Sequence, residues 1–290
     1  MNNDEIENED FAELVSLPPP ELLKEISEDE RYLILLTTPL KASANYKPKF
    51  GQGGKDGMSY EQFHEMYSSD PFYSWIGLDS PLMYAAHKAA GGMTSVYRQL
   101  GIGSQWILNQ VIQDHLGLTK DEANWSYEVP SSKGKTRKLS LDARIETSHI
   151  KDKAKRSVVE NWIDSVAEQV LLPVGTRENI KGVVIEARQG YKSKDSKRQN
   201  ADISNASNAY ANLYIPVLLL FSTQIDGDVA HRYKEAQWLL LNGSTNGTTV
   251  NSTYAFCRDV VGYDLQAFFT RNSPKIKKEI EIILEALLSA

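Results

Sequence analysis

The chain has 290 residues, of which 41% are hydrophobic, with a formal net charge of −6 and a single cysteine. One cysteine excludes an internal disulfide framework and a zinc site built from clustered cysteines. No stretch approaches eighteen uninterrupted apolar residues, and the N-terminus lacks a signal-peptide pattern. We therefore expect no membrane span and a cytoplasmic location.

Charge is unevenly distributed along the chain. Residues 1–30 contain eleven acids and one lysine, a net charge of −10, which leaves about +4 for residues 31–290. Basic residues gather at 133–138, 151–156 and 188–198. A single charge run most often marks a solvated face, but three basic clusters favour a polyanionic partner such as nucleic acid.

The first 120 residues are predicted to be an acidic arm followed by helices. Residues 1–30 form the arm, and residues 31–120 form a helical N-terminal region. Helices are expected at 60–67 and 81–90, with a break at Gly91 and Gly92. An amphipathic helix is expected next, beginning at 103–104 and ending at Gly117.

Residues 121–245 alternate between strand and helix patterns, which is typical of an α/β core. Strands are predicted at 125–128, 138–145, 183–188, 215–222 and 238–242, and helices at 153–171, about 195–211 and 228–236. Residues 246–290 predict C-terminal helices near 253–261 and 274–288. The apolar stripe of the last helix is expected to pack on the core or on a second subunit.

Two of the predicted strands carry acids at chemically suggestive positions. Asp142 lies on the polar face of the strand 138–145, and Glu186 follows the buried run 183–185. Two converging carboxylates bind a hard divalent cation such as Mg²⁺, which lowers the pKa of its water and neutralises charge on a phosphate. Each acid could instead form an ion pair, Asp142 with Arg144 or a nearby lysine, and Glu186 with Arg188 or Arg198.

The residues after Glu186 supply cations. Phosphodiester hydrolysis needs a cation near the nucleophile, and Lys192 and Lys194 are the candidates. The following helix start offers donors for guanine and an acceptor for cytosine N4. The loop 130–137 is small, basic and suited to a phosphate backbone. The predicted DNA-binding residues are Lys194, Asp195, Lys197 and Arg198 at the helix start, and Lys133, Lys135 and Arg137 in the loop.

The order of these features resembles the PD-(D/E)XK nucleases, and specifically type II restriction endonucleases, over about residues 91–242. The resemblance rests on SLDARIE and on VVIEARQGYKSKDSKRQNAD, whose basic run is similar to the subgroup that cuts sites with a CCGG core. It implies a mixed central sheet flanked by helices, with residues 121–245 as the nuclease core. It also implies Mg²⁺ bound by Asp142, Glu186 and Asp202, double-stranded DNA as partner, a homodimer or higher homo-oligomer, and a bacterial or archaeal source.

The sequence departs from this family at Arg188, where lysine is usual. Arginine does not readily give up a proton. Either Arg188 orients the phosphate, or the lysine role has moved to Lys192, which we favour, so the predicted catalytic set is Asp142, Glu186, Lys192 and Arg188. Two other interpretations stay open: a sequence-specific DNA-binding protein with an inactive nuclease-like core, and an interaction protein with solvated charge runs.

Overall fold

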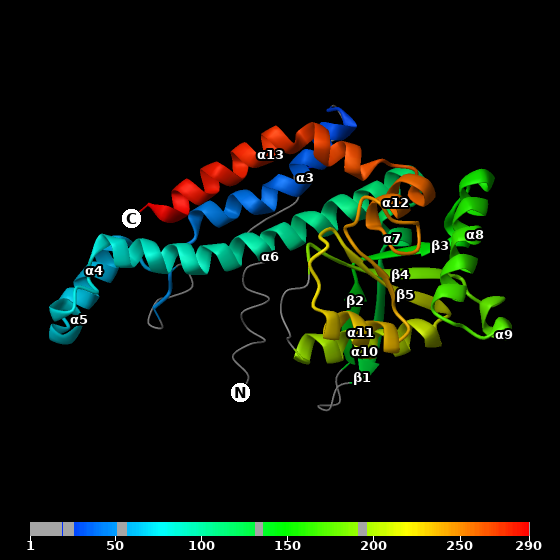
Figure 1. Cartoon of the computed structure of the whole chain (residues 1–290), viewed down its shortest axis with the longest axis horizontal. Helices are drawn as coiled ribbons and strands as arrows, with labels where there is room; N and C mark the ends of the chain where they lie inside the picture. Colours follow the sequence, from blue (N-terminus) through cyan, green and yellow to red (C-terminus); the bar gives the residue numbers. More distant parts are fainter. Residues whose placement is uncertain (1–18, 20–25, 51–56, 131–135, 191–195, 290) are drawn as a thin grey trace. The chain divides into compact units, whose positions relative to one another are not determined.

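The protein is described by a computed structural model covering residues 19, 26–50, 57–130, 136–190 and 196–289, with only the backbone given at 129–130, 136–137, 196–199 and 201. Its chain forms two compact units, one made of Met1–Gly103 and Arg271–Ala290, the other of Ser104–Thr270. The predicted C-terminal region 246–290 is therefore shared between the two units. A mixed α/β architecture with a helical N-terminal part is confirmed (Figure 1).

The first unit contains helices and no strand among its described residues. Its elements are α3 (Glu28–Ala42), η3 (Ser43–Asn45), α4 (Tyr60–Ser68), α5 (Pro71–Trp75), the first part of α6 (Pro81–Leu116) and the last part of α13 (Leu265–Leu288). A capping box between Ser27 and Glu30 begins α3, because each side chain binds the backbone N–H of the other residue. The last helix, α13, starts at Leu265, which is earlier than the predicted start at 274, and Pro274 lies inside it.

The predicted helix break at Gly91 and Gly92 is wrong, because α6 runs unbroken through both. A side chain at Gly91 would meet the Tyr46 hydroxyl at 2.1 Å, and one at Gly92 would meet Leu287 at 2.4 Å. Both glycines therefore let neighbouring side chains approach the helix backbone. This packing outweighs the cost of roughly 1 kcal/mol that a glycine carries inside a helix.

An apolar cluster holds the helices of the first unit together. It contains Leu40 from α3, Val96 from α6, and Ile283 and Leu287 from α13. The apolar stripe of the C-terminal helix thus packs inside the same chain, as one of the two predicted alternatives. Arg271 adds a two-pronged pair with Asp29, at 3.0 Å from Nε and 2.8 Å from Nη2 to the two carboxylate oxygens.

The second unit is built on a four-stranded mixed sheet in the order β3-β4-β5-β6. β3 (Ala143–Glu146) is antiparallel to β4 (Gly182–Arg188), whereas β5 (Tyr214–Leu220) and β6 (Leu239–Leu241) continue in parallel. The parallel pairs are joined by the crossover helices α10 (Ser196–Ala211) and α11 (Gly227–Glu235). All seven residues of β5 are buried, as expected of a strand covered on both faces.

Helices lie on both faces of this sheet (Figure 1). On one face, Ala206 and Ala209 of α10 and Tyr233 of α11 pack with Val184 and Leu218 in one buried cluster. Elsewhere in this unit, α8 (Lys153–Gln169) packs against β4 and against the π-helical turn η5 (Cys257–Val261), which directly follows α12 (Thr253–Phe256); the short helix α9 (Val174–Arg177) lies between α8 and β4 in the chain. Aromatic packing joins α8 to α12, since the ring centroids of Trp162 and Phe256 lie 4.6 Å apart.

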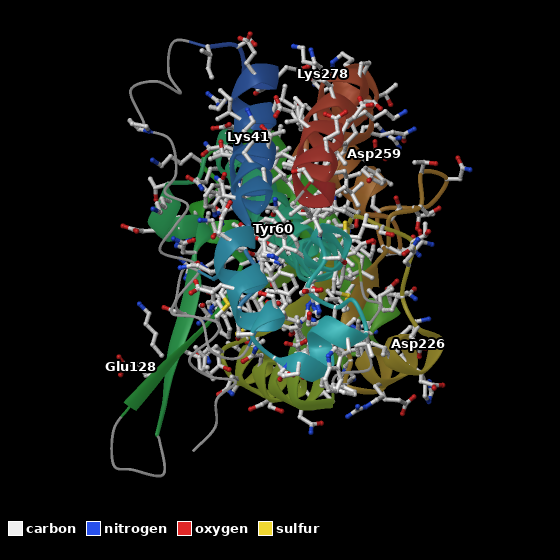
Figure 2. The ribbon with its side chains drawn as sticks, turned by 90° about the vertical axis from the view of Figure 1, so that its left-hand side faces the viewer. Lys41, Tyr60, Glu128, Asp226, Asp259 and Lys278 are labelled. Atoms are coloured by element: carbon white, nitrogen blue, oxygen red, sulfur yellow. The ribbon has the colours of Figure 1, made fainter. Side chains whose placement is uncertain are left out.

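The predicted strand 138–145 is divided into two by a bend at Asp142. Its first part, β2 (Thr136–Leu141), pairs with β1 (Trp125–Pro130) as a separate antiparallel hairpin, and Figure 2 shows Glu128 toward the end of it. Its second part, β3, joins the main sheet. The short helix α7 (Lys120–Ala123) precedes the hairpin, and η4 (Thr147–His149) follows β3. In the described part of the chain, no helix is long and apolar enough to cross a membrane.

Candidate functional site

The bend at Asp142 lies where the main sheet brings two predicted site residues together. Ala143 pairs with Ile185 across β3 and β4, so Asp142, one residue earlier, stands opposite Glu186, one residue later. The Asp142 carboxylate accepts a hydrogen bond of 2.7 Å from the backbone N–H of Ala187. The strand pairing therefore brings the carboxylate of Asp142 beside the backbone that carries Glu186.

The main chain at this bend is held from a helix of the same unit. Asn109, in the part of α6 that belongs to Ser104–Thr270, donates from Nδ2 to the Asp142 carbonyl oxygen at 2.8 Å. Gln113, one helical turn later, donates to the side-chain oxygen of Asn109. Two fixed contacts, one on the carbonyl and one on the carboxylate, thus orient Asp142 before any ligand arrives.

Glu186 and Arg188 lie on the same face of β4, because they are two residues apart in a strand. The Arg188 guanidinium Nη2 is 3.3 Å from Glu186 Oε1 and 2.5 Å from Asp202 Oδ2. All three side chains are largely buried, with 8%, 12% and 6% of the side-chain surface exposed for Arg188, Glu186 and Asp202. Arg188 therefore lies between two carboxylates and partly offsets their charge inside the protein.

Asp202 is anchored by a second donor that the sequence did not indicate. Tyr233 of α11 donates its hydroxyl proton to the same oxygen, Asp202 Oδ2, that binds Arg188. The Tyr233 ring is 1% exposed and meets the ring of Trp238 edge-on at 5.5 Å. A buried tyrosine needs a partner for its hydroxyl, but no local sequence signal identifies Asp202, 31 positions away, as that partner.

The residues present suit a hard cation by donor type. Asp142 and Glu186 supply carboxylate oxygens at adjoining positions of β3 and β4, and Mg²⁺ prefers oxygen ligands. Asp202, the third predicted ligand, accepts from Arg188 and Tyr233. Within the described ranges, no group of three or more His, Cys, Asp or Glu side chains is arranged to bind a metal. The predicted ligand set Asp142, Glu186 and Asp202 is therefore not such a group, and metal binding by Asp142 and Glu186 stays a prediction.

Several predicted residues cannot be placed relative to this cluster. Lys192, Lys194, Asp195, Lys133 and Lys135 lie outside the described residues. Lys197 and Arg198 belong to the first turn of α10, and Arg137 belongs to β2, but their side chains are not described. The DNA-binding set and the displaced catalytic lysine therefore stay predictions.

A separate carboxylate, Glu146, lies at the opposite end of the β3–β4 pair. It faces Gly182 and accepts a hydrogen bond of 2.5 Å from the Tyr214 hydroxyl and one of 2.8 Å from Ser148. Burial acts to raise the pKa of Glu146, but the hydrogen bonds from Tyr214 and Ser148 act to lower it. The net shift of the pKa is downward. Burial, and then Glu146 itself, raise the pKa of Tyr214 to about 12.

Comparison with other proteins adds no family to this geometry. No protein-family model, no curated protein and no solved structure matches the chain. The functional argument therefore rests on the residues of the Asp142–Glu186 site and on what they can do chemically.

Proposed function

We propose that the protein is a Mg²⁺-dependent, sequence-specific endonuclease of double-stranded DNA, of the type II restriction class. The observation that carries the proposal is the register of β3 and β4, which places Asp142 opposite Glu186 with its carboxylate bound to the neighbouring Ala187 N–H. Two acids meeting where an antiparallel strand pair ends support a site for a divalent cation and a phosphate.

In this proposal, Asp142 and Glu186 hold the cation. When bound, Mg²⁺ would lower the pKa of water and neutralise charge on the phosphate. The Ala187 N–H keeps the Asp142 carboxylate in place, Asn109 holds the main-chain carbonyl of the same residue, and Arg188 holds the carboxylate of Glu186. Arg188 is held by two carboxylates and cannot easily accept or release a proton, which favours Lys192 as the cation that orients water.

The proposal includes a symmetric assembly on DNA. A palindromic site presents the same sequence on both strands, so two copies of the chain related by a two-fold axis would act on it. Lys194, Asp195, Lys197 and Arg198 would contact bases, and Lys133, Lys135 and Arg137 would contact phosphates. The proposed setting is the cytoplasm of a bacterium or archaeon.

The deciding experiment compares wild type and Asp142→Ala on DNA of known sequence with Mg²⁺. We expect wild type to give discrete fragments, and the variant to bind the same DNA while cutting it at least about a thousandfold more slowly, since a group that holds the metal is lost. Asp164→Ala, which changes an acid of α8 far along the sequence from these strands, is the matched control and should cut normally. Cutting by Asp142→Ala at the wild-type rate would refute the proposal.

One observation favours a second function, a DNA-binding protein with an inactive nuclease-like core. Glu186 is ion-paired with Arg188, which stands at the usual lysine position. If this pair persists on DNA, Glu186 contributes less charge to a metal. Site-specific binding without any fragments at millimolar Mg²⁺ would establish this function instead of the first.

A further inference from the structure

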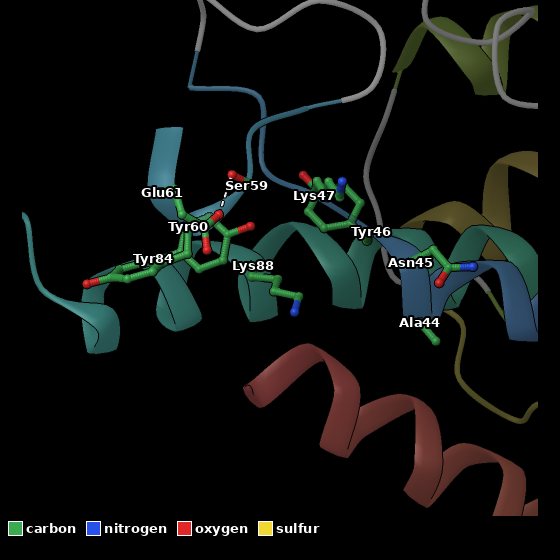
Figure 3. Close-up of a pocket in the computed structure, with 9 residues that line it drawn as sticks. All are labelled: Ala44, Asn45, Tyr46, Lys47, Ser59, Tyr60, Glu61, Tyr84 and Lys88. Atoms are coloured by element: carbon green, nitrogen blue, oxygen red, sulfur yellow. Dashed lines mark hydrogen bonds between the residues drawn. The ribbon is translucent and has the colours of Figure 1, made fainter. Parts of the chain in front are cut away.

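A cavity in the first unit lies outside everything that the proposed nuclease uses. Its volume is about 340 Å³, which is at the lower end of the range for small-molecule sites. Three segments form its walls: residues 44–47 after α3, residues 59–61 at the start of α4, and Tyr84 with Lys88 on α6 (Figure 3). All of them belong to Met1–Gly103.

The walls of this cavity are fixed by contacts of their own. The Tyr84 hydroxyl donates to the Met58 carbonyl at 2.8 Å, which ties α6 to the segment that leads into α4. Ser59 forms a capping box with Gln62 and donates from Oγ to Glu61 at 2.7 Å. Tyr46 packs on the bare backbone of Gly91. The cavity is therefore largely formed before a ligand enters it, which lowers the entropy cost of binding.

Two lysines give the cavity its charge. Lys47 and Lys88 come from different walls, and neither forms an ion pair with a described residue. Lys88 donates from Nζ to the carbonyl oxygen of Ser289 at 3.1 Å, so its partner among the described residues is neutral. Glu61 is the one acid among the described residues of the lining, and its hydrogen bond from Ser59 lowers its pKa. The balance of one excess positive charge favours an anionic ligand.

Aromatic rings form the other part of the lining. Tyr46, Tyr60 and Tyr84 contribute their rings, and Tyr60 and Tyr84 meet edge-on with centroids 5.7 Å apart (Figure 3). His64 stacks against Tyr60 at 5.7 Å and an angle of 23°, so the Tyr60 ring is held from behind. Tyrosine rings offer flat surfaces on which a planar ring can stack.

We propose that this cavity binds a small molecule that combines a planar heteroaromatic ring with an anionic group, of the nucleoside monophosphate class. The tyrosines would contact the ring, and Lys47 and Lys88 would bind the phosphate as charge-assisted donors. Ser59, Asn45 and Glu61 supply polar groups between them that suit sugar hydroxyls. A purely apolar ligand would exclude water from the two lysines without binding their charges, which is unfavourable. A bare anion would make no contact with the tyrosine rings.

The test is isothermal titration calorimetry on the full-length protein without Mg²⁺, using adenosine monophosphate, adenosine and inorganic phosphate as separate probes. We expect the monophosphate to bind one site per chain, and each fragment to bind at least about tenfold more weakly, since each keeps only part of the contacts. Lys47→Met with Lys88→Met should weaken the monophosphate by about tenfold or more. Lys41→Met, an exposed lysine of the same unit outside the lining, should not.

Three outcomes would overturn the proposal: no saturable binding of the monophosphate, equal binding of inorganic phosphate, or unchanged affinity in the double lysine variant. Asp142→Ala should bind the monophosphate as wild type does, because Asp142 is not part of this cavity. The two proposals therefore fail separately: cutting by Asp142→Ala at the wild-type rate refutes the nuclease, and absence of saturable monophosphate binding to wild type refutes the cavity assignment.

Discussion

The two units use cations in opposite ways. In the second unit, Arg188 is 7% exposed and lies between the carboxylates of Glu186 and Asp202. In the first unit, Lys47 and Lys88 line an open cavity and have no acid as ion-pair partner among the described residues. A cation that is buried and paired stabilises and orients its neighbours, whereas one that faces a cavity is available to a ligand. Burial and ion pairing together therefore distinguish a cation that stabilises the fold from one that can bind a ligand.

The largest expected effect comes from removing one partner of the buried cluster. Asp202→Asn removes the nearer of the two carboxylates beside Arg188, and breaking a buried ion pair costs up to about 3–5 kcal/mol of the free energy of unfolding, of which the remaining pair with Glu186 offsets a part. Urea denaturation measures this loss. Glu279→Gln is the control, because its pair with Lys41 is exposed and 3.5 Å long, and such pairs contribute about 0–1 kcal/mol. Equal losses in the two variants would contradict the distinction between buried and exposed pairs.

A smaller effect is expected from the hydroxyl of Tyr233. Tyr233→Phe removes the donor to the charged Asp202 and should lower the free energy of unfolding by about 1.5–3 kcal/mol. Tyr84→Phe removes a hydroxyl that donates to a neutral carbonyl in the first unit, and should cost about 0.5–1.5 kcal/mol. The comparison by chemical denaturation fails if Tyr84→Phe destabilises the protein more than Tyr233→Phe.

The loss of folding stability at acid pH should depend on Glu146. Its folded pKa lies below the usual 4.5, so its contribution is fully present above pH 4.5 and is lost as the pH falls through the folded value. Glu146→Gln should therefore show a weaker loss of stability between pH 5 and 3 than wild type, by thermal unfolding. Glu61 also has a lowered pKa but is exposed, so Glu61→Gln should follow wild type more closely. Identical pH profiles for wild type and Glu146→Gln would refute this assignment.

The smallest effect is expected in the cavity. Lys47→Met removes an exposed charge that has no ion-pair partner within the described ranges, so the free energy of unfolding should change by no more than about 0.5 kcal/mol. Thermal unfolding in the absence of ligand measures this change. A loss above about 2 kcal/mol would show that Lys47 stabilises the fold, and would place it with Arg188 instead of with ligand-binding cations.

Local pattern was enough to indicate the strands that position the site. The alternation around Asp142 follows the two-residue period of a strand, and the continuous apolar run 183–185 before Glu186 is typical of a strand buried on both faces. Their pairing then follows from the antiparallel register, which sets Ala143 against Ile185. The bend at Asp142 was not predicted, because the alternation of apolar residues continues through it while the backbone changes partners from β1 to β4.

The supporting residues were beyond the reach of sequence pattern. Tyr233 contacts a residue 31 positions away, and Asn109 contacts one 33 positions away. Each looks like an ordinary member of a helix, and only the folded chain brings it to its acid. The unbroken course of α6 through Gly91 and Gly92 has the same origin, since the close approach of Tyr46 and Leu287 comes from tertiary packing.

The alkylation rate of the single cysteine can measure how often part of the second unit opens. Cys257 is fully buried in the π-helical turn, and burial raises the pKa of its thiol to about 12. Alkylating reagents attack the thiolate, which is scarce at neutral pH even if the reagent could enter. Labelling should therefore proceed only from states in which η5 has separated from the core. The rate of labelling at a single natural position would then report how often that region opens, without any engineered probe.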